Sequence, residues 1–413
     1  MNSFFSNTKV HLFFLSAAVF ISRIPFLRAG FGAEEDSWLL ALTAKNIALS
    51  GEYEMSRAPA HPLQEIIYSW FYNGGLNAFS TNLLSAAGSV ITSLFFALSL
   101  KNIGFRHYIF AAFAFAFTPV VFISSVYTID YMPAMAFVMM SFYFITLPSK
   151  SWTIILAGIF LGIAIGFRLT SAIMLLPFCV LLLSISQGGW KKILVLGFSA
   201  CIIGLLTYIP VIKTYGTSFF TFADQFPYPN FPKVLYKGTL GVFGFIGLGA
   251  ILFFKIKILI QRIRMKEKLI PDMLPKNIFY ASCTAIILYI FSYLRLPQKS
   301  AYLIPLIPFV ILLSGYYLSG RAFKIFCVLL TMSSFLFSIN LTDSLRGSKH
   351  SPLAVKFTAA GQEIFIDPLT GPIFSDYTKR LNKISYTEEV YQRISIEQKK
   401  LFSSADGGTM SCV

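Results

Sequence analysis

Charged residues are scarce in this chain. Only 13% of its 413 residues are Asp, Glu, Lys or Arg, whereas about a quarter of the residues in a soluble domain are charged. An ordinary water-soluble enzyme is therefore excluded. Disorder is excluded as well, because 56% of the residues are apolar and 16% are aromatic, and disordered chains are poor in both kinds. The composition is typical of a protein that crosses a membrane many times.

Cysteine pairs and common catalytic motifs are also lacking. The five cysteines form no C-x-x-C pair, and four of them lie inside apolar segments, so neither a disulfide framework nor a zinc site is indicated. The motifs H-E-x-x-H, G-x-x-x-x-G-K-[ST] and G-x-S-x-G are absent. Lys and Arg outnumber Asp and Glu by 34 to 18, but most of the excess lies in short loops between apolar segments. That placement indicates membrane topology and no nucleic-acid partner.

Eleven apolar segments are predicted to cross the membrane, because a spanning helix needs about 20 apolar residues. The first is interpreted as a retained span and not as a removed signal peptide, since it carries Arg23 and no clear small-residue cleavage site follows. The fold class predicted is an all-α polytopic membrane protein. It has a transmembrane domain over 1–341, with short helices in a long first outer loop at 28–75, and a small α/β outer tail over 342–413. The predicted spans are 10–27, 76–100, 108–125, 131–147, 152–167, 170–187, 193–212, 234–254, 277–294, 301–319 and 323–341.

The orientation follows from the basic residues in alternate loops. One set of loops holds 14 Lys and Arg in 43 residues, and the other set holds 9 in 87. Because cytoplasmic loops are enriched in Lys and Arg, the first set is predicted to be cytoplasmic, with the N-terminus inside and the tail outside. The prediction depends on divisions between spans at Tyr127–Asp130 and at Arg168–Thr170, since losing one of them would invert everything downstream.

Three segments outside the spans have less specific interpretations. In the tail, a strand at Glu363–Ile366 and a helix from Tyr386 to Leu401 are predicted. The basic stretch from Lys255 to Lys276 is interpreted as a topology determinant that contacts anionic lipid. The aromatic loop from Phe219 to Phe231 fits two interpretations equally well, a cover over a lipid-binding groove or an interfacial belt.

The first outer loop contains the strongest candidate for chemistry. Residues 37–50 lack Gly and Pro and are mostly good helix formers, and Gly51 suits a helix end. Asp36 is then predicted at the N-terminus of this helix, facing the membrane surface. Helix capping explains such a carboxylate equally well, because a negative charge interacts favourably with that end of the helix dipole.

The order of motifs in this loop resembles that of a known family. Asp36 after the first span, Gly51-Glu52-Tyr53 fifteen residues later and then His61-Pro62 resemble the first outer loop of GT-C glycosyltransferases. The bacterial protein O-mannosyltransferase-like and aminoarabinose-transferase-like members are the most similar. The segments Phe117–Asp130 and Arg295–Pro305 resemble later outer turns of the family, and the resemblance covers most of residues 10–320.

The sequence departs from the family pattern at two places. It has Asp36-Ser37 where Asp-Glu is common, and His61-Pro62 where Lys-Pro is frequent. These departures leave the subfamily open, and with it the acceptor. The resemblance implies an inverting transfer of a sugar from a polyprenyl phosphate to a hydroxyl of a lipid, glycan or protein. It also implies that the reaction takes place on the outer face of a membrane, expected to be a bacterial inner membrane.

Roles for individual residues follow from this implied reaction. The acceptor hydroxyl needs a base, for which Asp36 is the leading candidate, with Glu35 and Asp130 as further catalytic carboxylates. The departing lipid phosphate needs cationic or polar partners. Metal dependence varies in the family, so it stays open whether Asp36 and Asp130 hold a divalent cation, Mg or Mn. The candidate phosphate ligands are His61, Arg57, Arg168, Arg295, Lys299 and Tyr302.

Each of these residues also has a purely structural explanation. Arg295 and Lys299 flank predicted spans, where long basic side chains reach the lipid headgroups. His61 fits a polar position in a Pro-bounded turn, and Arg168 fits an interface anchor. Asp130 fits a cap for the helix that begins near Met132-Pro133, since Pro favours the first helical turn.

Two other classes of membrane protein handle lipid-linked sugars. A polytopic transporter or flippase would place its charges near mid-membrane, often in broken helices related by internal repeats. Here the acidic cluster lies in a loop, and no repeat is evident. A polysaccharide polymerase or ligase would be expected to have its large outer loop late in the chain, whereas this chain has an early one.

Overall fold

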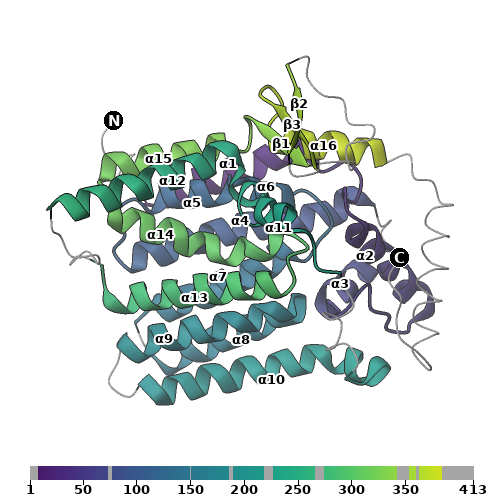
Figure 1. The fold of residues 1–413 in the computed structure, drawn as a ribbon. Coiled ribbons are helices and arrows are strands. Elements are labelled where there is room, and N and C mark those ends of the chain that lie inside the picture. Colours follow the sequence, from purple (N-terminus) through teal and green to yellow (C-terminus); the bar gives the residue numbers. More distant parts are fainter. Residues whose placement is uncertain are drawn as a thin grey trace.

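The protein is a bundle of helices whose axes run mostly side by side (Figure 1). A computed structural model describes residues 8–72, 77–148, 150–185, 189–217, 227–265, 274–341, 353–359 and 362–383. The predicted tail helix at 386–401, residues 219–226 of the aromatic loop and residues 266–273 of the basic stretch lie outside the described residues. In chain order the helices are α1 (Thr8–Arg23), η2 (Ile24–Phe26), α2 (Glu35–Ser50), α3 (Pro62–Tyr72), α4 (Ala78–Asn102), α5 (Tyr108–Ala116), α6 (Pro119–Ser124), α7 (Tyr131–Thr146), α8 (Ser151–Phe167), η3 (Leu169–Met174), α9 (Leu175–Ile185), α10 (Gly189–Tyr215), α11 (Phe231–Gly238), α12 (Leu240–Met265), α13 (Lys276–Arg295), η5 (Ser300–Leu306), α14 (Ile307–Tyr317), α15 (Gly320–Met332) and α16 (Pro372–Lys383).

Six of the described helical segments are long and apolar enough to span a membrane. Three shorter apolar helical segments, at Tyr131–Thr146, Ser151–Phe167 and Leu169–Leu183, pack among them. The predicted fold class, an all-α polytopic membrane protein, is therefore confirmed, whereas the count of eleven spans stays a prediction. The six long segments are Thr8–Phe26, Ala78–Asn102, Gly189–Tyr215, Leu240–Arg264, Lys276–Arg295 and Ser300–Tyr317.

Two predicted spans are divided in the structure. The segment 108–125 forms α5 and α6, because Pro119 starts a new helix and has no N–H with which to continue the previous one. The segment 234–254 is divided at Thr239, whose backbone leaves the helical region (φ −128°, ψ −81°). α12 then continues to Met265, so the basic stretch predicted as a loop begins inside a helix. The apolar stems of Lys and Arg are compatible with that position.

The last predicted span, 323–341, ends early. α15 stops at Met332, and residues 338–341 form a strand. The serines that follow α15 bond to other helices: the Ser333 hydroxyl donates to the Phe243 carbonyl at 2.6 Å, and the Ser334 hydroxyl donates to the Phe117 carbonyl. An apolar run fits a helix or a buried strand, so the sequence pattern alone does not separate them here.

A three-stranded antiparallel sheet precedes α16 in the described tail. Its strands β1 (Ser338–Leu341), β2 (Val355–Ala359) and β3 (Gln362–Asp367) are ordered β1-β3-β2. The predicted strand at Glu363–Ile366 lies in β3 and is confirmed. Since β1 pairs with β3, with Ile339 opposite Ile366, the sheet begins before residue 342, where the sequence placed the start of the tail.

Helices α4 and α7 approach each other backbone to backbone. A Cβ added at Gly88 of α4 would lie 2.9 Å from the carbonyl carbon of Met132 and 2.9 Å from the nitrogen of Pro133. Real Cβ atoms do not come this close to backbone, so only glycine fits at this position. The contact fixes the first turn of α7, and with it Asp130, beside α4.

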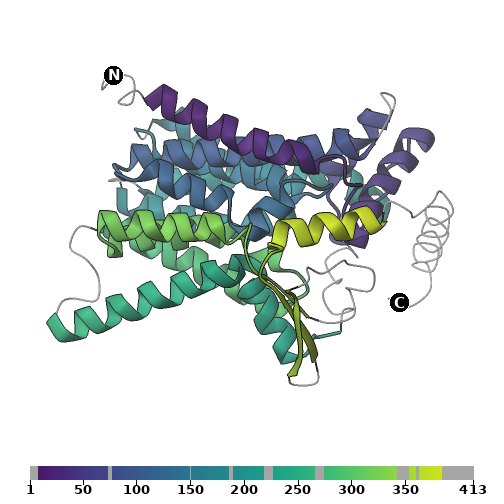
Figure 2. The same ribbon diagram turned by 90° about the horizontal axis from the view of Figure 1, so that it is seen from above.

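The segments outside the bundle gather at one of its ends. Figure 1 shows α2 and α3 at the right end of the bundle, with the sheet and α16 above them. Figure 2 shows α2, the sheet and α16 at this same end when the molecule is seen from above. The segment 28–72 and the described part of the tail therefore lie at the same end of the bundle.

Candidate active site

Asp36 lies in the first turn of α2. The predicted helix over 37–50 and its end at Gly51 are confirmed: Gly51 has φ 72° and donates its N–H to the Ile47 carbonyl at 2.9 Å. Asp36 is not the N-cap, because Glu34 occupies that position without a capping side-chain bond. The Asp36 carboxylate instead pairs with Arg57 Nε at 3.0 Å and with the Lys299 ammonium.

Asp130 is a buried anchor for two arginines. It directly precedes α7 but makes no capping side-chain bond there. Its Oδ1 accepts from Arg57 Nη2 at 2.6 Å, and its Oδ2 accepts from Arg168 Nη1 at 2.6 Å. Arg57 therefore bridges Asp36 and Asp130. The capping explanation of Asp130 does not hold, because both carboxylate oxygens are engaged with arginines.

Arg168 lies where α8 ends and η3 begins. Besides its ion pair with Asp130, its guanidinium carbon lies 4.3 Å from the ring centre of Tyr131 and 5.1 Å from that of Tyr302. Cation–π contacts of this kind add to the attraction where water is excluded. Arg168 is thus held by one carboxylate and two aromatic rings, and not by lipid headgroups.

The other two basic candidates differ in their surroundings. Lys299, just before η5, pairs with Glu34 Oε2 at 2.7 Å and with Asp36, so its side chain is directed at carboxylates and not at lipid headgroups. Arg295 is the exposed last residue of α13 and lines the cavity described below. Glu35 is exposed on α2 and does not line that cavity, and its role as a catalytic carboxylate stays a prediction.

His61 is buried at the start of α3. Its Nδ1 lies 3.0 Å from the Phe167 carbonyl oxygen, which can only accept, so Nδ1 carries the proton. Burial and the neighbouring Arg57 lower the pKa of His61 to about 3. A neutral imidazole with its single proton on Nδ1 can only accept at Nε2. His61 lines the cavity, and its role as a phosphate ligand stays a prediction, one that requires a proton on Nε2.

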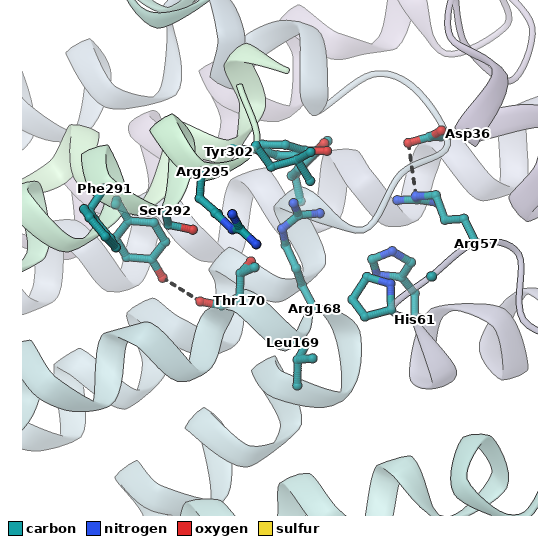
Figure 3. A pocket seen from close by; sticks show the side chains of 15 residues that line it. Asp36, Arg57, His61, Arg168, Leu169, Thr170, Phe291, Ser292, Arg295 and Tyr302 are labelled. Atoms are coloured by element: carbon teal, nitrogen blue, oxygen red, sulfur yellow. Dashed lines mark hydrogen bonds and ion pairs between the residues drawn. The ribbon is translucent and has the colours of Figure 1, made fainter. Parts of the chain in front are cut away.

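The candidate residues meet around one cavity of about 260 Å³. Figure 3 shows Asp36, Arg57 and His61 on one side and Phe291 and Ser292 on the other, with the two remaining arginines and Tyr302 between them. Asp130 and Lys299 do not line the cavity and act on it through the side chains they hold. The sequence-predicted residues that line it are Asp36, Arg57, His61, Arg168, Arg295 and Tyr302.

Both aspartates of the site are ionised. Burial by itself would raise the pKa of each carboxyl. At Asp36, Arg57 and Lys299 outweigh burial and hold the pKa at about 2. At Asp130, the two guanidiniums outweigh burial and hold the pKa well below its usual range.

The donor set does not fit a divalent cation. Arg57, Arg168 and Lys299 engage the carboxylates of Asp36 and Asp130. Within the described ranges, no group of three or more His, Cys, Asp or Glu side chains is arranged to hold a metal ion. A Mg or Mn ion would need several oxygen ligands at once, which the two ion-paired carboxylates do not offer.

Several residues of the site were not predicted from the sequence. Tyr131, Thr170, Tyr289 and Ser292 line the cavity, but they lie in or beside apolar segments and carry no charge pattern. Glu65 was also missed. It is fully buried and accepts from the Tyr53 hydroxyl at 2.5 Å and from the N–H and hydroxyl of Ser56 at 2.8 and 2.7 Å, which fixes the loop that carries Arg57.

The bundle and the cavity at its end are those of a polytopic membrane protein whose fold is found among solved structures. The same fold is found in two crystal structures of ArnT from Cupriavidus metallidurans. The structure bound to undecaprenyl phosphate has a TM-score of 0.56 and 15% identity, with 78% of this chain and 62% of that chain covered. The structure in the apo state has a TM-score of 0.52 and 15% identity, with 76% and 60% covered.

At 15% identity the similarity to ArnT shows the fold and does not show the activity. This chain spans about three fifths of the length of the ArnT chains it matches. No protein-family model matches the sequence, and no curated protein matches it. The resemblance to GT-C glycosyltransferases expected from the sequence is confirmed at the level of the fold, so the activity has to be argued from the site itself.

Proposed function

We propose that this protein is a GT-C-type glycosyltransferase that moves a sugar from a polyprenyl-phosphate donor to an acceptor hydroxyl. The observation that carries the proposal is the convergence of Asp36, Arg57, Arg168 and Arg295 on one cavity. These residues come from three distant segments, the loop 28–75, the junction of α8 and η3, and the end of α13, which meet at the end of a membrane-spanning bundle. Support comes from the shared fold with ArnT, one structure of which is bound to undecaprenyl phosphate.

The cavity has a chemically suitable place for each part of such a donor. Arg168 and Arg295 present guanidinium groups for the phosphate, which suits a group that gains charge as it leaves. At the other side, Phe291 lines the cavity and is 73% exposed on α13. Together with exposed Ile287 and Leu294 on the same helix, it offers an apolar path for the polyprenyl chain toward the bilayer.

Asp36 is proposed as the base. Its carboxylate takes the proton of the acceptor hydroxyl as the hydroxyl oxygen bonds to the anomeric carbon. The bond between that carbon and the phosphate oxygen breaks, and its electron pair stays on the polyprenyl phosphate. Attack from the side opposite the phosphate inverts the configuration of the sugar.

The donor itself is proposed to activate this base. With a pKa of about 2, Asp36 binds a proton weakly, and a base works best when its pKa is near the working pH. Arg57 and Lys299 are the two cations that lower the pKa of Asp36. Arg57 lines the cavity and Lys299 does not, so an incoming phosphate competes for Arg57 and weakens the combined attraction of the two cations. Losing part of their attraction raises that pKa, so Asp36 becomes a stronger base when the donor is in place.

The proposed location in the membrane follows from the resemblance to GT-C glycosyltransferases and from the charges of the loops. We place the transmembrane catalytic domain over 1–341 in a bacterial inner membrane, with the N-terminus in the cytoplasm and the cavity and tail on the outer face. Positive charge on cytoplasmic loops supports this orientation. The acceptor is proposed to be a hydroxyl of a lipid, glycan or protein that reaches the outer face.

The test is a complementation experiment in cells that lack the gene. Glycans and glycolipids are compared by mass analysis after expression of the parent, Asp36→Asn or Glu52→Gln, an exposed carboxylate just past α2. We expect a sugar modification that the parent and Glu52→Gln restore and that Asp36→Asn reduces at least a hundredfold, with the donor lipid accumulating on the outer leaflet. Activity of Asp36→Asn within a few-fold of the parent would contradict the proposal. Donor lipid trapped on the inner leaflet would favour a flippase.

A further inference from the structure

Arg380, in the helix α16 of the tail, is completely buried. Its Nη1 donates to the carbonyl oxygens of Phe26 at 3.2 Å and Val126 at 2.8 Å. Its Nε lies 2.9 Å from Asp376, one turn earlier on the same helix. A buried guanidinium is costly unless acceptors surround it. The arrangement therefore depends on α16 staying in place against both carbonyls.

The two carbonyls belong to the two loops that carry the aspartates of the site. Phe26 ends η2 and begins the loop that leads to Asp36, and Val126 lies in the turn directly before Asp130. The loops also bond to each other, because the Thr128 N–H donates to the Phe31 carbonyl at 2.7 Å. Arg380 thus lies where the two acid-bearing loops meet.

The same two loops are held from inside the bundle by α4. The Asn82 amide donates to the Leu27 carbonyl at 2.8 Å and to the Gly30 carbonyl at 3.0 Å, and its oxygen accepts from the Thr128 hydroxyl at 2.9 Å. The Ser85 hydroxyl donates to the Tyr127 carbonyl at 2.8 Å. The loops are therefore fixed on one side by α4 and on the other by α16.

Apolar contacts accompany the Arg380 bonds. The Phe26 ring packs edge-on against Tyr377 at 5.4 Å and lies 6.0 Å from Phe374. Ile373 is only 1% exposed, and its N–H donates to the Ser334 carbonyl at 3.3 Å. One face of α16 is thus packed against the helix bundle, so this helix of the tail is an integral part of the fold.

We infer that α16 is a clamp over the active-site loops and that Arg380 is a positioning residue that keeps Asp36 and Asp130 in reach of the same arginine. Arg57 bridges the two carboxylates at 3.0 and 2.6 Å, and both contacts depend on the separation of the loops. Without Arg380 the loops lose a shared donor, and Asp36 moves relative to Arg57. The consequence for catalysis rests on the proposed function, whereas the consequence for the loops does not.

The test measures hydrogen–deuterium exchange of the purified full chain in lipid nanodiscs. Arg380→Met is compared with Arg380→Lys and with Leu381→Ala, an exposed neighbour on the same helix. For Arg380→Met we expect at least tenfold faster exchange in peptides covering 27–36 and 125–131, with α8 and α10 unchanged. Arg380→Lys keeps a donor and should recover part of the protection, and Leu381→Ala should match the parent.

Two outcomes would overturn the inference: unchanged exchange in both loops, or equally faster exchange throughout the bundle, which would mean general destabilisation.

A second measurement is the pH profile of sugar transfer. Loss of Arg57 from Asp36 raises the pKa of the base, so the acid limb should move to higher pH in Arg380→Met. If Arg380→Met exchanges faster in both loops but the parent transfers no sugar, the clamp is supported and the proposed function is refuted. If the parent transfers sugar but Arg380→Met changes neither the acid limb nor the exchange, the proposed function stands and the clamp is refuted.

Discussion

At the scale of single residues, Arg57 determines how the site is arranged. It contacts both aspartates, one at the edge of the cavity and one completely buried. The sequence indicated the residue types and their common side of the membrane, but it did not indicate that Asp130 would bind two arginines. Such pairs join positions 73 and 38 residues apart, and only the packing of α4, α7 and α8 brings them together. The neutral state of His61 likewise follows from burial, which the sequence does not show.

The shared cations lead to a prediction about pH. The acid limb of kcat/KM reports the free enzyme, in which Asp36 has a pKa of about 2, and the acid limb of kcat reports the donor complex. Because the carboxylate is the active form, activity is present above the pKa and is lost as the pH falls through it. The phosphate competes with Asp36 for Arg57, which lines the cavity, so we expect the limb of kcat at higher pH than that of kcat/KM. In initial rates of sugar transfer between pH 3 and 8, kcat should fall toward the acid end while kcat/KM stays level. A kcat that also stays level over this range would refute activation by the donor.

At the scale of helices, local signals in the sequence predicted some boundaries well. Gly51 ends α2 as expected because it supplies the left-handed conformation of a helix end. Other boundaries depend on contacts with distant segments. α15 stops where Ser333 and Ser334 bond to carbonyls of α12 and of the α5–α6 break, and no local signal marks that place. α12 runs into the basic stretch since its charged side chains can extend past the apolar region.

The contact between α4 and α7 gives a prediction about stability. In Gly88→Ala the added methyl would meet the α7 backbone at 2.9 Å, so the helices must separate. We expect a loss of about 1–3 kcal/mol and weaker sugar transfer, because Asp130 moves with α7. The matched control is Gly197→Ala on α10, where an added Cβ meets no atom within 4 Å. Thermal unfolding in one detergent should show a lower midpoint for Gly88→Ala only, and equal midpoints would contradict the close backbone packing.

At the scale of the whole molecule, the charged side chains of the site lie at one end of an apolar bundle. The composition predicted the membrane-spanning class, and the order of motifs predicted the GT-C fold. The sequence did not predict that α16 of the tail would dock on the loops of the site, because a single buried arginine in a short polar segment has no distinctive pattern. That Phe291 both lines the cavity and is exposed on α13 also emerges only from the packed helices.

The central claim is that this cavity faces outward and binds a polyprenyl phosphate. It is tested most directly by introducing Ser292→Cys into a cysteine-free chain and measuring its labelling by an impermeant maleimide added outside right-side-out vesicles. The account predicts labelling from outside that undecaprenyl phosphate slows at least several-fold and that undecaprenol, which lacks the phosphate, does not slow. Labelling only from the cytoplasmic side, or a rate unaffected by undecaprenyl phosphate, would contradict it.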